Sequence, residues 1–168
     1  ALKFHGGVAR ENLSEENLPA LRAGLANLNR HINNLRENYG VPAVVSINQF
    51  VADTDAEVEL VMEHCKALGV QVALSSHWAN GGAGATDLAH MVAEICDADP
   101  TPANTPHNSF VYPGELSLWE KLEAVATKVY HASEITASSK VRDRLKELTD
   151  GGYGHLPVCI AKTPYSFS

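Results

Sequence analysis

The apolar positions of this chain follow two periods, which alternate along the first 98 residues. Over residues 18–35 they recur every three or four residues, which predicts a long amphipathic helix that Ser14 can cap and Gly40 ends. The runs at 41–47 and 70–75 are short and continuously apolar, as in strands buried on both faces of a parallel sheet.

Further elements complete this alternation. The stretch from Asp53 to Glu57 resembles a capping box, in which Thr54 or Asp53 accepts the first amides of a helix that runs to Leu68. Residues 2–4 are expected to be the end of a strand, and helical spacing returns at 88–95, after a glycine cluster. This order of strands and helices predicts an α/β fold, with a doubly wound parallel sheet and right-handed crossovers.

The pattern changes near residue 97, where a stretch with four prolines begins and is expected to be a loop. Later elements are expected to be two helices, at 116–131 and 139–148, and two short strands, at Ile135 and 156–161. The sequence therefore predicts an α/β sheet portion over 1–98, a connecting loop over 99–114 and a smaller C-terminal α/β segment over 115–168.

Composition narrows the classes of function. The chain of 168 residues is 45% hydrophobic and 20% charged, which is typical of a folded domain. Its net charge of −7 argues against a nucleic-acid partner, and no apolar run approaches the length of a membrane span. The three cysteines are far apart and not in a CxxC spacing, so we expect small buried residues in a reducing cytoplasm.

Aromatic and polar residues follow two successive strands directly. Asn48, Phe50 and Asp53 come after the first strand, and Trp78 comes after the second. Neighbouring strands lie about 4.8 Å apart, so Phe50 and Trp78 can form the two walls of a slot for a planar ring. The alternative is that Asn48 and Asp53 only stabilise a turn and that the aromatic side chains belong to the core.

Glycines and a lysine suggest a second kind of ligand. Glycines at the start of a helix let backbone N–H groups approach an anion, although neither GxGxxG nor GxxxxGK[ST] is present. A tight turn is the alternative for the glycines, and a solvated side chain is the alternative for the lysine. The eight scattered histidines predict no metal site. The candidates for a nucleotide or phosphate neighbourhood are His5, Gly6, Gly7, Gly81, Gly82 and Lys162.

Four motifs occur in order along the chain: ALKFHGGV, INQF followed by DT, SSHWANGGAG, and LPVCIAKTPYSFS. Together they resemble the formate–tetrahydrofolate ligase family, also called formyltetrahydrofolate synthetase. The resemblance implies a three-layer fold similar to P-loop NTPases. It also implies an ATP-dependent enzyme that uses Mg²⁺, formate and tetrahydrofolate and passes through formyl phosphate. The resemblance further implies a monovalent cation in the full enzyme. It also implies a cytoplasmic homo-oligomer, which is a tetramer in full-length members of the family.

The resemblance also implies roles for individual residues. In the family, the aromatic of the INxF motif and the tryptophan of the HWxxGG motif stack on the pterin of the folate. These positions are Phe50 and Trp78 in this sequence. Asn48 and Asp53 match the same motif and are expected to bind the pterin or support the backbone, and Leu74 is expected to line the slot.

The family's phosphate loop and its arginine for formyl phosphate precede the first motif, and its sequence continues beyond the last. The chain thus resembles an internal or truncated piece whose ATP site lies mostly elsewhere. Phosphoryl transfer depends on that loop and Mg²⁺, so we expect no ligase activity from this chain alone, and weak affinity for tetrahydrofolate. Two alternatives stay open: a non-catalytic folate or nucleotide binding module, and an inactive structural fragment that packs against the remainder of its parent chain.

Overall fold

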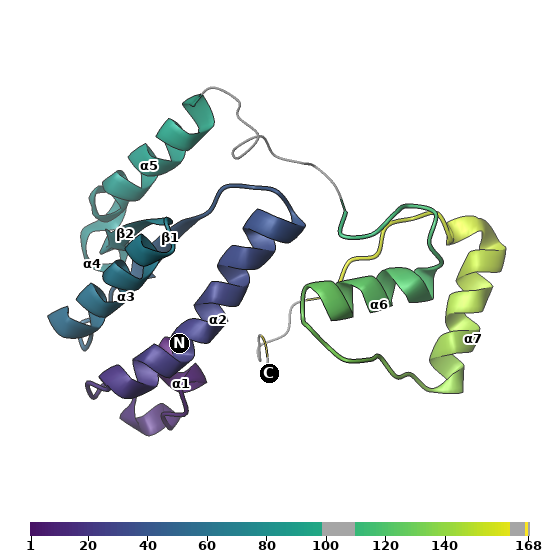
Figure 1. The fold of residues 1–168 in the computed structure, drawn as a ribbon, viewed down its shortest axis with the longest axis horizontal. Helices are drawn as coiled ribbons and strands as arrows, with labels where there is room; N and C mark the ends of the chain where they lie inside the picture. The colour runs from purple at the N-terminus through teal and green to yellow at the C-terminus, as the bar shows by residue number, and fades with distance from the viewer. Residues whose placement is uncertain (99–109, 162–166, 168) are drawn as a thin grey trace. The chain divides into compact units, whose positions relative to one another are not determined.

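The computed structural model describes residues 1–98, 110–161 and 167, and Figure 1 shows their secondary structure. The chain divides into two compact units. The described residues of the first unit are 1–36 and 40–98, and those of the second are 37–39, 110–161 and 167.

Two parallel strands joined by a helix lie at the centre of the first unit. Strand β1 (Val44–Asn48) pairs with β2 (Gln71–Ser75), in a register that places Val44 opposite Gln71 and Asn48 opposite Ser75. Helix α3 (Asp55–Ala67) connects them. The predicted α/β alternation with parallel strands is therefore confirmed for this pair, and the sheet of the described residues has these two strands.

The start of α3 follows the predicted capping box. The Thr54 hydroxyl accepts a hydrogen bond from the Glu57 amide at 3.3 Å, and the Glu57 carboxylate accepts one from the Thr54 amide at 3.4 Å. These contacts satisfy amides that have no partner within the helix. The helix is followed by Gly69 at a φ of +63°, a conformation that glycine adopts without steric cost.

Helix α2 (Leu18–Asn33) covers most of the predicted residues 18–35, but a different residue caps it. The cap is Asn17 and not Ser14, because the Asn17 side chain accepts a hydrogen bond from the Ala20 amide at 2.9 Å. Pro19 lies in the first turn, where its missing N–H costs nothing. The segment before it contains a short 3₁₀ helix (Arg10–Asn12), and α2 continues into a π-helical turn (Asn34–Asn38).

The prediction of a strand at residues 2–4 is wrong, since this segment forms the one-turn helix α1 (Leu2–His5). The backbone of α1 packs directly on α2: a Cβ added to Gly24 would overlap the Leu2 carbonyl oxygen, and one added to Gly6 would overlap that of Ala20. A few apolar residues fit either a strand or a helix, so their pattern does not separate the two. Residues 2–4 form a helix because Gly6 and Gly24 allow its backbone to pack closely against α2.

The core of the first unit lies between α2, α3 and the sheet. Its buried side chains come from the two helices, and side chains of both strands pack against them. Cys65 is fully buried here, as predicted, whereas Cys96 and Cys159 are exposed, which corrects that prediction for them. The buried cluster consists of Leu21, Leu25, Leu60, Val61 and Cys65, with Val45, Ile47 and Val72 among the residues packed on it.

After β2, the chain forms α4 (His77–Asn80), a 3₁₀ helix (Gly81–Ala85) and α5 (Thr86–Asp97), which contacts both strands. The predicted helix at 88–95 is thus confirmed within a longer one. None of the helices in the described part of the chain is long and apolar enough to cross a membrane.

The second unit contains α6 (Leu118–Lys128), α7 (Ser139–Leu148) and a π-helical turn (Thr149–Tyr153). Both helices were predicted, but the expected strands at Ile135 and 156–161 are wrong for the described residues. The Tyr112 hydroxyl accepts a hydrogen bond from the Val158 amide at 2.8 Å and donates one to its carbonyl at 3.2 Å. A side chain therefore satisfies the backbone groups that a neighbouring strand would otherwise bind.

Candidate functional site

Phe50 lies in the turn that follows the carboxyl end of β1, and Trp78 lies in the short helix α4 that follows β2. The strands end opposite each other, and the Gln49 amide donates to the Ser75 carbonyl at 3.1 Å, so the two segments that follow them begin side by side. Phe50 is 60% exposed and Trp78 is 75% exposed. Neither side chain is therefore buried in the core of the first unit.

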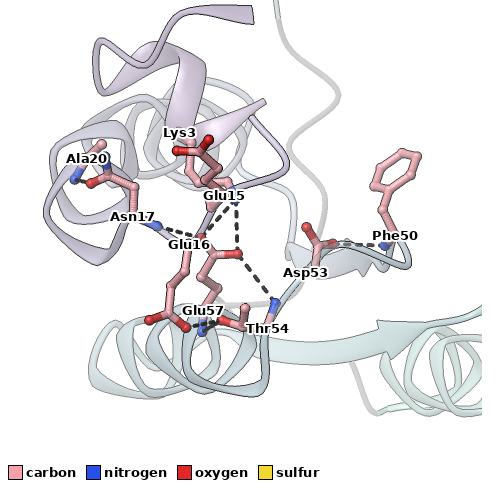
Figure 2. A network of polar contacts seen from close by, with 9 residues as sticks. All are labelled: Lys3, Glu15, Glu16, Asn17, Ala20, Phe50, Asp53, Thr54 and Glu57. Carbon is pink, nitrogen blue, oxygen red and sulfur yellow. Dashed lines mark hydrogen bonds and ion pairs between the residues drawn. The ribbon is translucent and has the colours of Figure 1, made fainter. Parts of the chain in front are cut away.

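The turn after β1 is held by Asp53. Its carboxylate accepts a hydrogen bond from the Phe50 amide at 2.8 Å, and its own amide donates to the Phe50 carbonyl at 3.0 Å. In Figure 2 the ring of Phe50 points away from these contacts. Asp53 thus supports the backbone that carries the ring, which is one of the two roles considered for it.

A cavity of about 570 Å³ opens beside β1 within the first unit. Asn48, Phe50 and Asp53 line it together, so the structure gathers three of the predicted site residues around one space. Its wall also includes Lys3 and Glu57, which sequence reasoning had not selected. Trp78 and Leu74 are not among its lining residues; Leu74 lies on β2 and is 38% exposed.

Lys3 and Glu57 form a buried ion pair near the turn, shown in Figure 2. The Lys3 ammonium lies 2.9 and 3.1 Å from the two carboxylate oxygens of Glu57 and also donates to the Glu15 carbonyl at 2.9 Å. Glu57 further accepts a hydrogen bond from the Asn17 amide at 3.0 Å. The capping-box spacing was a signal for Glu57, but nothing in the sequence singled out Lys3.

These contacts keep Glu57 ionised. Burial raises the pKa of its carboxyl, but the hydrogen bond and charge of Lys3 and the amides of Asn17 and Thr54 outweigh burial. The resulting pKa lies below the ordinary value for glutamate. The first unit therefore holds a fixed negative charge, with its counter-ion, next to the candidate site.

The glycines that follow α4 close a tight turn. The Ser76 amide donates to the Gly84 carbonyl at 3.0 Å, and a Cβ added to Gly84 would lie 2.5 Å from the Ser76 carbonyl carbon. Gly81 has a φ of +57°, while a Cβ on Gly82 would meet nothing within 4 Å. At Gly81 and Gly84 the structure thus agrees with the tight-turn alternative.

The other candidates for a phosphate neighbourhood are spread along the chain. Gly6 serves the close approach of α1 to α2, whereas Gly7 has a φ of +96° and open space around it. Burial lowers the pKa of His31, and the charge of His5 lowers it further. Lys162 lies outside the described residues. Among the described residues, no group of three or more His, Cys, Asp or Glu could hold a metal ion.

The geometry is that of an α/β protein with exposed aromatic side chains at the carboxyl edge of parallel strands, the edge at which such proteins bind ligands. Comparison with known proteins agrees: the sequence model of the formate–tetrahydrofolate ligase family matches residues 1–168. The chain belongs to the formate–tetrahydrofolate ligase family.

Curated relatives carry the same name. The chain is 54% identical over 168 residues to the formate–tetrahydrofolate ligase of Methylococcus capsulatus, covering all of this chain and 29% of the relative. It is 51% identical over 171 residues to that of Granulibacter bethesdensis, covering 28% of it, and 46% identical over 168 residues to that of Pelagibacter ubique, covering 29%. The chain therefore spans less than a third of the length of these relatives.

Proposed function

We propose that this chain supplies the pterin-binding part of an enzyme that forms 10-formyltetrahydrofolate from formate, tetrahydrofolate and ATP. The observation that carries the proposal is the exposure of Phe50, in the turn after β1, and of Trp78, in α4 after β2, at one edge of the sheet. Exposed aromatic faces at a strand edge are a surface on which a planar heterocycle can stack. Asn48 and Leu74 complete the set of pterin contacts, and Asp53 positions Phe50.

The remainder of the enzyme supplies the ATP chemistry in this proposal. Phosphoryl transfer needs a phosphate loop and Mg²⁺ to neutralise the developing charge. The two strands described here are then part of a larger parallel sheet in a three-layer fold similar to that of P-loop NTPases. His5, Gly6, Gly7, Gly81, Gly82 and Lys162 are the candidates in this chain for contact with the nucleotide or its phosphates. By itself, the chain binds tetrahydrofolate weakly and does not catalyse the ligation.

Calorimetric titration with tetrahydrofolate tests the stacking role. Stacking of a ring on an aromatic side chain contributes about 1–3 kcal/mol per base in nucleic-acid complexes, so Phe50→Ala and Trp78→Ala should each weaken binding about tenfold. Circular dichroism should be unchanged, since both side chains are exposed. The matched controls are Phe110→Ala, at an exposed phenylalanine of the second unit, and Trp119→Ala; both should bind as the unaltered chain does.

Two results would contradict the proposal. Equal heats for the unaltered chain and for Trp78→Ala would show that Trp78 is not a wall of the pterin site. ATP-dependent formylation of tetrahydrofolate by this chain alone would show that the ATP site does not lie elsewhere.

A further inference from the structure

Burial of the Lys3–Glu57 ion pair costs desolvation free energy. The two residues are 7% and 4% exposed, so both charges have left most of their water. Ion pairs of this kind are weak evidence for stability, because desolvation offsets much of their attraction. The pair has nonetheless no unsatisfied polar atom among its described groups, which is the condition under which a buried charge fixes one geometry.

Glu57 connects three separate parts of the chain. Its carboxylate binds Lys3 from α1, the amide of Asn17 before α2, and the amide of Thr54 before α3. A second contact supports the same arrangement, because the Thr54 hydroxyl donates to the Glu16 carboxylate at 2.6 Å. Thr54 is thereby fixed from two sides, and it directly follows Asp53.

The turn that carries Phe50 is consequently held at both ends. At its start, the Gln49 amide is bound to Ser75 of β2, and at its end Thr54 is bound to Glu57. Between these points the turn is closed by the contacts of Asp53 with Phe50. A displacement of Thr54 would therefore move the ring of Phe50.

We propose that Glu57, with Lys3 as its counter-ion, is a positioning residue for the pterin site and sets the place of Phe50 through Thr54 and Asp53. This inference rests on the proposed function. Neither residue has to touch the ligand. Loss of the ammonium leaves a buried carboxylate without its counter-ion, which draws in water or moves toward solvent and releases Thr54.

The test is titration of this chain with tetrahydrofolate at neutral pH, under conditions in which circular dichroism shows every variant to be folded. Lys3→Met should weaken binding about tenfold. The double variant Lys3→Met with Glu57→Gln should recover most of this loss, since it contains no unpaired charge and the amide oxygen can still accept a backbone N–H. The matched controls on the exposed surface of α3, Lys66→Met and Glu59→Gln, should leave the affinity unchanged.

A second measurement separates positioning from a general effect on the fold. In a double-mutant cycle, Lys3→Met should add little to the loss caused by Phe50→Ala, because both changes remove the same contact with the ligand. The loss of binding free energy caused by Lys3→Met should be fully additive with the loss caused by Asn48→Ala, because Asn48 is a separate contact of the ligand. If Lys3→Met does not fold, Glu57→Gln replaces it in both measurements.

The outcomes distinguish this inference from the proposed function. Binding by the unaltered chain, together with unchanged affinity of folded Lys3→Met and Glu57→Gln, would overturn the positioning role alone. Additive losses from Lys3→Met and Phe50→Ala would also overturn it. Absence of binding by the unaltered chain would instead refute the proposed function on which it rests.

Discussion

The close contact between α1 and α2 makes Gly24→Ala the sharpest test of the fold. Gly24 lies in the middle of α2, where alanine ordinarily stabilises a helix by about 1 kcal/mol relative to glycine. Here the added Cβ would overlap the Leu2 carbonyl oxygen and lie 2.7 Å from the carbonyl carbon. These are backbone atoms, so no side-chain rotation can relieve the overlap.

The overlap should outweigh the gain in helix propensity. Carbon atoms pack at about 3.5–4.0 Å, so α1 must move away from α2 by roughly an ångström. Overpacking of a core costs about 1–3 kcal/mol, and a rigid backbone neighbour places this case at the upper end. We therefore expect a net loss of about 2 kcal/mol in the free energy of unfolding. The movement also strains the Lys3–Glu57 pair, because Lys3 lies on α1.

Urea unfolding followed by circular dichroism measures the loss, and hydrogen exchange of peptides from α2 assigns it to the first unit. Gly82→Ala is the control, because a Cβ at that position would meet nothing within 4 Å and its stability should change by less than about 0.5 kcal/mol. If Gly24→Ala is as stable as the unaltered chain or more stable, the direct packing of α1 on α2 is refuted.

Two further predictions concern titrating groups. The pKa of Glu57 is lowered on folding, so its contribution to stability is complete above the unfolded value of about 4.3 and is lost as the pH falls through the lower folded pKa. Glu57→Gln should therefore have a lower urea midpoint than the unaltered chain at pH 7, and this difference between the two should disappear in acid. Glu59→Gln should have the same urea midpoint as the unaltered chain at every pH. Burial raises the pKa of the Cys65 thiol, so a thiol reagent at neutral pH should modify the two exposed cysteines quickly and Cys65 only on unfolding; rapid reaction of all three would contradict the buried core.

The elements that were predicted correctly depend on short-range physics. The capping box at Thr54 and Glu57 involves groups three residues apart, and their pairing needs no distant partner. The same holds for the helical spacing of α2 and for the apolar runs that became β1 and β2. The carboxyl-edge location of Phe50 and Trp78 follows from these strands, because both residues come directly after them.

The errors occurred where local pattern allowed two structures. Residues 2–4 became a helix because Gly24 lets their backbone lie against α2, which is a contact over about twenty residues of sequence. In the part of the chain that the structure describes, the final expected strand has no strand beside it, and the Tyr112 hydroxyl binds the Val158 backbone instead. Both contacts join segments that are far apart in the sequence, so the local sequence pattern does not predict them.

The sequence by itself thus determined the family, the parallel strand pair and the aromatic residues at its carboxyl edge, because motifs, hydrophobic period and capping act over a few residues. Only the tertiary structure decided that Phe50 and Trp78 are exposed and that Asp53 closes the turn beneath the ring. It alone brought Lys3 within 2.9 Å of Glu57 across 54 positions of the chain. The physical reason is that burial and charge pairing depend on which distant segments share one core, and that choice is made by the fold as a whole.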